Sequence, residues 1–160
     1  IREIKEIVVD GGVYSCYTLW NLVHRNLKFI AQERTKMLFD EGLIRKMVSY
    51  EEERYHYFII NHLASEQWLM FEEALLPLLN FNQGYFLKNA VEKMPVEFLG
   101  NESVQIFFAK RFAALNYFTQ VAFLKRLVGV PIRWSLRQAL QSEFNASNTL
   151  KNQLIAKLLN

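Results

Sequence analysis

Cysteine, glycine and proline are all scarce in this chain of 160 residues, which contains one Cys, six Gly and three Pro. A single cysteine excludes an internal disulfide framework and is typical of a reducing compartment, so we expect an intracellular protein, cytoplasmic or nuclear. So few turn-forming residues argue against a β-sandwich, which needs a turn signal every ~8 to 12 residues. The sequence therefore predicts an all-α protein whose helices are joined by short connections.

Long apolar runs are absent as well. No run approaches the ~18 apolar residues that a membrane-spanning helix needs, and the opening IREIKEIVVD does not have the pattern of a signal peptide. We therefore expect no membrane partner. The chain has no initiator Met, and we expect it to be a fragment of a longer protein. Its 160 residues are enough to bury a core as one domain over 1–160.

Apolar residues recur every three or four positions almost throughout, which is the period of an α-helix and not of a strand. Two stretches are each expected to stack their apolar residues on one side of a helix: Cys16, Leu19 or Trp20, Val23, Leu27 and Ile30 in the first, and Val104, Phe108, Phe112, Leu115 and Phe118 in the second.

Breaks in this pattern fall at 10–12, 41–43, 77, 94–95, 100–101 and 129–131. They predict roughly nine or ten helices of about 8 to 18 residues. Asn101 is expected to cap one helix, and Ser49 with Glu52 to form a capping box at another. Helices this short are marginal in isolation, so they must pack on their neighbours.

Three segments share one order of features: a leucine-rich helix, a short polar break and a second helix introduced by a small residue. The first segment contains Leu19–Trp20–Asn21–Leu22 and then 41–44. The second segment contains 60–64 and then 73–77, and the third contains 115–118 and then 128–131. These segments resemble armadillo repeats, which have a period of about 42 residues.

The resemblance implies a right-handed α-solenoid of about three to four armadillo-like repeats; a HEAT-like array or a compact helical bundle is the alternative. It also implies a non-enzymatic scaffold that binds a peptide or a partner domain on a concave helical surface. In armadillo proteins that grip extended peptides, a ladder of asparagines holds the ligand backbone. The corresponding positions hold Asn21, His62 and Tyr117, so only one asparagine of that ladder is present.

Seven residues are the candidate partner contacts. Asn21 offers both a donor and an acceptor to a partner's main chain, and Trp20 offers stacking area. The alternative is that Asn21 bonds a nearby carbonyl and Trp20 belongs to the core. The full set is Trp20, Asn21, Arg25, His62, Arg111, Tyr117 and Arg126.

Charge is distributed unevenly along the chain. Residues 1–80 carry nine Lys and Arg against twelve Asp and Glu, whereas 81–160 carry ten against four. Between Ser103 and Ser142 all charged side chains are basic: Lys110, Arg111, Lys125, Arg126, Arg133 and Arg137. This segment suits an acidic protein partner; the alternatives are a solvated helix face and a nucleic-acid-binding domain that uses 103–142.

Catalytic motifs are not found in the sequence. Glu53 and His56 have the spacing used in di-iron bundles, but those sites need a second such pair. Cys16 has no His or Lys near it in sequence to lower its pKa. We therefore predict no enzymatic activity, no metal site and no cofactor, and a metal-dependent helical enzyme is the minor alternative.

Overall fold

A computed structural model describes residues 12–50, 52–80, 85–144 and 148–159, and all regular secondary structure in them is helical. The all-α prediction is confirmed. The chain divides into two compact units, 1–39 and 40–160. The prediction of one domain over 1–160 stays a prediction.

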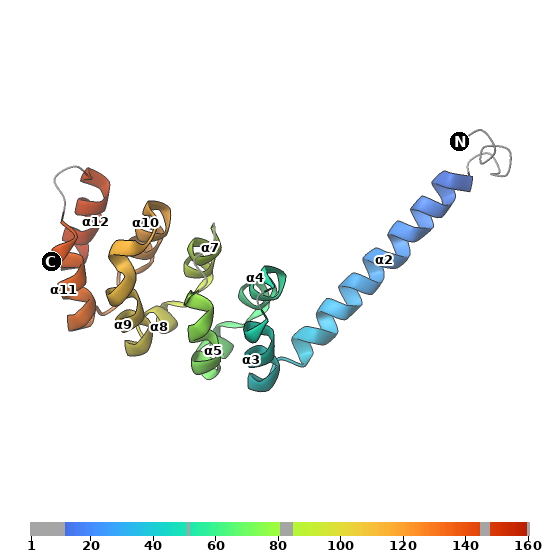
Figure 1. Cartoon of the computed structure of the whole chain (residues 1–160), viewed down its shortest axis with the longest axis horizontal. Coiled ribbons are helices and arrows are strands. Elements are labelled where there is room, and N and C mark those ends of the chain that lie inside the picture. Colours follow the sequence, from blue (N-terminus) through green and yellow to red (C-terminus); the bar gives the residue numbers. More distant parts are fainter. Residues whose placement is uncertain (1–11, 51, 81–84, 145–147, 160) are drawn as a thin grey trace. The chain divides into compact units, whose positions relative to one another are not determined.

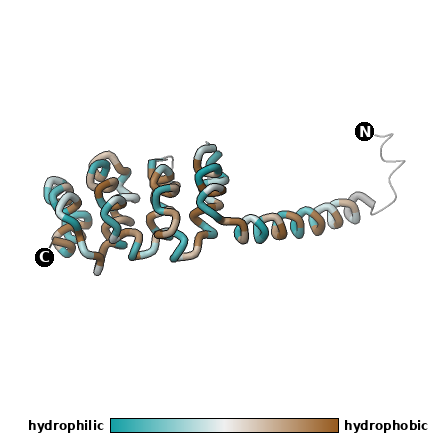
Figure 2. Tube along the Cα trace, turned by 90° about the horizontal axis from the view of Figure 1, so that it is seen from below, coloured by the Kyte–Doolittle hydropathy of each residue, from teal (hydrophilic) through white to brown (hydrophobic). Residues whose placement is uncertain are grey.

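The first unit contains α2 (Gly12–Met37), a single helix of 26 residues and longer than the sequence predicted. Hydrophobic and hydrophilic residues alternate along it (Figure 2). Its large apolar side chains, Trp20 and Leu27 among them, are exposed. Nowhere in the described part of the chain does a helix combine the length and apolarity needed to cross a bilayer.

The second unit contains short helices joined by tight connections (Figure 1). In chain order they are α3 (Glu41–Ser49), α4 (Glu53–His62), α5 (Ser65–Met70), α6 (Glu72–Leu75), the 3-10 helix η1 (Leu76–Asn80), α7 (Phe86–Lys93), α8 (Val96–Leu99), α9 (Glu102–Arg111), the 3-10 helix η2 (Phe112–Ala114), α10 (Tyr117–Arg126), α11 (Trp134–Ser142) and α12 (Thr149–Leu159).

Side-chain caps determine where several of these helices begin. Asp40 accepts from the Leu43 amide at 2.7 Å before α3, and Asn116 accepts from the Thr119 amide at 2.9 Å before α10. Asn101 caps α9 as predicted. The capping box at Ser49 is wrong, because Ser49 is the last residue of α3 and α4 is preceded by Glu52.

Helix ends also agree with the predicted breaks at 94–95, 100–101 and 129–131. Gly129 has a φ of +86°, a left-handed conformation that L side chains avoid, and it lies between α10 and α11. The break predicted at 41–43 is displaced, because Gly42 lies inside α3 and the chain turns before Asp40 instead.

Helices α7 and α10 pack side by side and run parallel. At their beginnings the rings of Tyr85 and Phe118 lie 6.1 Å apart. At their ends the Arg126 guanidinium donates to the Met94 carbonyl that follows α7. Between these contacts Val91 and Phe123 are fully buried.

Other helices of the second unit also pack on one another. Tyr57, in the middle of α4, meets Phe86, the first residue of α7, with ring centroids 5.2 Å apart. Further main contacts join α10 to α12, α3 to α6, α5 to α8 and α9 to α11. A hydrogen bond joins α11 to the end of α12: Arg137 in α11 donates to the carbonyl of Leu159 at 2.9 Å.

Gln105 joins α9 to the connection before α11. Its amide nitrogen donates to the carbonyls of Leu99 at 3.1 Å and Pro131 at 2.9 Å, and its amide oxygen accepts from the Arg133 backbone at 2.7 Å. The side chain is fully buried. All the polar atoms of this buried amide are therefore used to hold two backbone segments together.

Replacing Gln105 with Leu removes these hydrogen bonds while keeping a similar volume. We expect Gln105→Leu to lower the free energy of unfolding by about 2 to 4 kcal/mol, because it leaves buried backbone groups without partners. Urea unfolding followed by circular dichroism measures the change. Gln138→Leu, at an exposed position of α11, is the matched control; equal effects of the two substitutions would contradict the role of Gln105.

Candidate functional site

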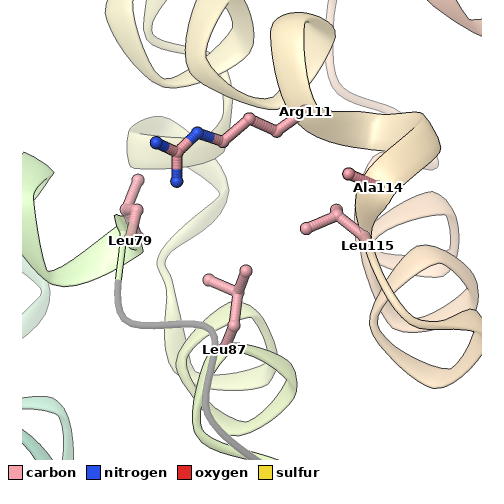
Figure 3. Close-up of a pocket in the computed structure, with 5 residues that line it drawn as sticks. All are labelled: Leu79, Leu87, Arg111, Ala114 and Leu115. Atoms are coloured by element: carbon pink, nitrogen blue, oxygen red, sulfur yellow. The ribbon is translucent and has the colours of Figure 1, made fainter.

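A pocket of about 160 Å³ lies where η1, α7 and the end of α9 with η2 meet. The described residues that line it are Leu79, Leu87, Arg111, Ala114 and Leu115. Figure 3 shows Leu87 and Leu115 pointing into the hollow from opposite elements, and the Arg111 side chain extending across one side of it. Among the described lining residues, Arg111 supplies the one charged group and the other four are apolar.

Packing beneath the pocket holds its walls in place. Leu79 and Leu87 are buried in the core of the second unit. The short η2 helix is fixed by Gln120 in α10, whose side chain donates to the Phe112 carbonyl at 2.8 Å. Phe112 itself is buried, so the turn carrying Ala114 is held from both sides.

Arg111, the last residue of α9, is exposed and lies over the Phe107 ring, with its guanidinium carbon 4.9 Å from the ring centroid. This cation–π contact orients the side chain without neutralising it. No Asp or Glu in the described ranges comes within ion-pair distance of its guanidinium. The charge at the pocket is thus positive and accessible to solvent.

Three exposed aromatic residues lie close to the pocket and are named the aromatic rim: Tyr85, Tyr117 and Phe118. They are 60%, 41% and 56% exposed. Phe118 is in ring contact with both tyrosines, at 6.1 Å from Tyr85 and 5.9 Å from Tyr117. Each rim residue is two or three positions along the chain from a residue that lines the pocket: Tyr85 from Leu87, and Tyr117 and Phe118 from Leu115.

Two of the seven predicted contact residues are found here: Arg111 lines the pocket, and Tyr117 belongs to the aromatic rim. Arg126 lies at the opposite end of α10, where it is half-buried and donates to the Met94 carbonyl. His62 is half-buried on α4, with its ring stacked 4.3 Å from Phe58 and its Nδ1 bonded to the carbonyl of Phe58 at 2.8 Å.

The other three, Trp20, Asn21 and Arg25, lie on α2 in the first unit. The Asn21 amide donates to the Tyr17 carbonyl one helical turn earlier, at 3.0 Å. The Trp20 ring stacks on His24 at 4.1 Å and remains exposed. The partner-binding role of these residues stays a prediction.

Sequence reasoning missed Tyr85 and placed Phe118 on one side of a single helix with Val104, Phe108, Phe112 and Leu115. Those four side chains are buried, but Phe118 is exposed. The reason is local: after η2 the backbone of Leu115 and Asn116 is extended, so the helical period does not continue into α10. An Asn within an apolar helical pattern was the available signal for this break.

The spacing of Glu53 and His56 has a structural explanation. His56 is buried, and its Nε2 donates to the Tyr50 carbonyl at 2.9 Å. Among the described residues, no group of three or more His, Cys, Asp or Glu side chains is placed so that it could bind a metal ion.

Substitutions in the aromatic rim should affect stability little. Tyr85→Ser and Phe118→Ser are each expected to lower the free energy of unfolding by about 1 kcal/mol or less, because both rings are more than half exposed. Phe123→Ala, at a fully buried ring in α10, should cost about 3 to 5 kcal/mol. Thermal and urea unfolding provide the comparison, and a loss of folding in either rim variant would show that the rim is part of the core.

No model of a protein family, no curated protein and no solved structure matches this chain.

Proposed function

We propose that this chain is a non-enzymatic scaffold for protein–protein interaction, which binds a peptide or a partner domain. The observation that carries the proposal is the surface formed by the aromatic rim, Arg111 and the leucine pocket. Aromatic residues and arginine are the side chains most enriched where binding energy is concentrated in protein interfaces. None of the described residues that line the pocket is a nucleophile or a general base.

The same proposal includes the architecture, a right-handed α-solenoid of about three to four armadillo-like repeats with a concave binding surface. Its support is the order of the helix contacts, in which α4, α7, α10 and α12 each pack on the next. In a solenoid each repeat contacts its neighbours and the array leaves an extended surface for a partner. We also place the protein inside the cell, cytoplasmic or nuclear, because its lone cysteine, Cys16, is an exposed free thiol.

Nucleic-acid binding through 103–142 is less well supported than protein binding. Two of the six basic side chains are engaged in holding helices: Arg126 to the Met94 carbonyl and Arg137 to the Leu159 carbonyl. An RNA-binding surface needs many phosphate contacts, and these two guanidinium groups are committed elsewhere.

Removal of the aromatic rim should abolish partner binding. We expect a protein captured from the native source to be retained by the unmodified chain and lost from the variant Tyr85→Ser/Tyr117→Ser/Phe118→Ser, because the variant removes the aromatic contact area. The captured protein is then purified and titrated against both. Met70→Ser, at a residue 70% exposed at the end of α5, is the control and should bind normally. Equal binding by all three chains would refute the proposed surface.

Salt dependence separates a protein scaffold from an RNA-binding domain. We expect an RNA pool to elute below about 200 mM salt both from the unmodified chain and from Arg111→Glu/Arg133→Glu. Arg111 and Arg133 are chosen because, in the described structure, neither guanidinium is hydrogen-bonded to a backbone carbonyl of another helix. RNA retained above that salt concentration by the unmodified chain, and released by the variant, would favour nucleic-acid binding instead.

A further inference from the structure

We propose that the pocket binds one large apolar side chain of an acidic peptide, and that a side-chain carboxylate of the same peptide pairs with Arg111. This inference rests on the proposed function and names the chemistry of the partner. It combines the size of the pocket, the orientation of Arg111 and the charges around them.

The size of the pocket fits a single side chain. An apolar cavity of about 150 Å³ holds a benzene molecule, and this pocket measures about 160 Å³. Its apolar lining comes from Leu79, Leu87, Ala114 and Leu115, so a leucine or phenylalanine side chain is the occupant that gains most by leaving water.

Arg111 supplies the polar part of the site. The ring of Phe107 holds the guanidinium from one side, and the group extends along the pocket (Figure 3). A guanidinium held in this way presents its N–H groups to a carboxylate with little loss of side-chain entropy. A carboxylate beside the apolar anchor of the ligand is therefore the matching group.

The surrounding charges favour an acidic ligand. Residues 103–142 contain no Asp or Glu, and Lys110 next to Arg111 is exposed. The one carboxylate on α7, Glu92, pairs with Lys88 at 2.7 Å. The field at the pocket is positive and attracts an acidic segment, while it disfavours a basic one.

The aromatic rim extends the contact area beyond the pocket. Tyr85 immediately precedes α7, which carries Leu87, and Phe118 lies at the start of α10, just after Leu115; the two rings are 6.1 Å apart. A peptide anchored in the pocket thus has exposed rings beside it on which its neighbouring residues can pack. An anchor surrounded by aromatic contacts is the usual arrangement of an energetic centre in an interface.

Synthetic peptide pools test this division of roles. The probes are fluorescein-labelled, C-terminally amidated pools with a fixed Leu flanked by Glu, and matched pools in which Gln or Lys replaces Glu or Ala replaces Leu. Amidation ensures that only side-chain carboxylates are present. Fluorescence anisotropy should show that the Glu–Leu pool binds about fivefold more tightly than the Gln–Leu pool, with the Lys–Leu and Glu–Ala pools weaker still.

Variants of the chain assign the two parts of the site. Arg111→Gln should remove the preference for Glu over Gln. Ala114→Phe should fill the pocket and weaken binding of the Glu–Leu pool about tenfold. Ala113→Phe, at the preceding exposed position of η2, does not line the pocket and should leave binding unchanged. In the unmodified chain, NMR signals of the Leu87 and Leu115 methyl groups should shift with the Glu–Leu pool, which gives a measure independent of variant folding.

The inference is overturned if the Glu–Leu and Gln–Leu pools bind alike, if Ala114→Phe binds as well as Ala113→Phe, or if no pool binds and no methyl signal shifts. These outcomes leave the proposed function standing when the aromatic rim is still required for capture of the protein partner. Loss of that requirement refutes the proposed function itself, so the two failures are distinguishable.

Discussion

Parallel packing of α7 against α10 is the contact on which the candidate site depends. Neither helix is longer than ten residues, and helices of that length gain most of their stability from burying one face against a neighbour. Val91 and Phe123 supply that buried face, while Arg126 closes the far ends on the Met94 carbonyl. The pair is joined at both ends: Tyr85 and Phe118 meet at the beginnings of the helices, and α7 also carries Leu87, which lines the pocket.

Arginines of the second unit are divided between structural and exposed roles. Arg126 and Arg137 donate to backbone carbonyls at helix ends, where a cation also complements the helix dipole. Arg45 has a comparable role at the surface: hydrogen bonding to Glu41 raises the pKa of Arg45 above its ordinary value, and a further contact reaches Glu73 at the start of α6. Arg111 differs because its neighbour is an aromatic ring, and its charge remains available to a ligand.

Sequence periodicity predicted the helical class and most of the buried residues of α9, and the breaks at Gly100 and Gly129 were located correctly. Arg111 and Tyr117 were also identified as candidate contacts. The pocket was not predictable, because Leu79, Leu87 and Leu115 have the same apolar pattern as core residues and only their tertiary positions distinguish them. Likewise, nothing in the sequence distinguishes a structural arginine such as Arg126 from an exposed one, since that difference arises from the partner it meets in the fold.

The main helix contacts of the second unit all join segments separated by at most two intervening α-helices. Low contact order of this kind favours rapid folding, because little loop-closure entropy is lost before each contact forms. It also allows the terminal helices, such as α12, to open locally at lower free energy than the middle of the unit. Helices α7 and α10 each have packed neighbours before and after them in the chain. The pocket therefore lies in the part of the second unit whose backbone amides should exchange their hydrogens most slowly.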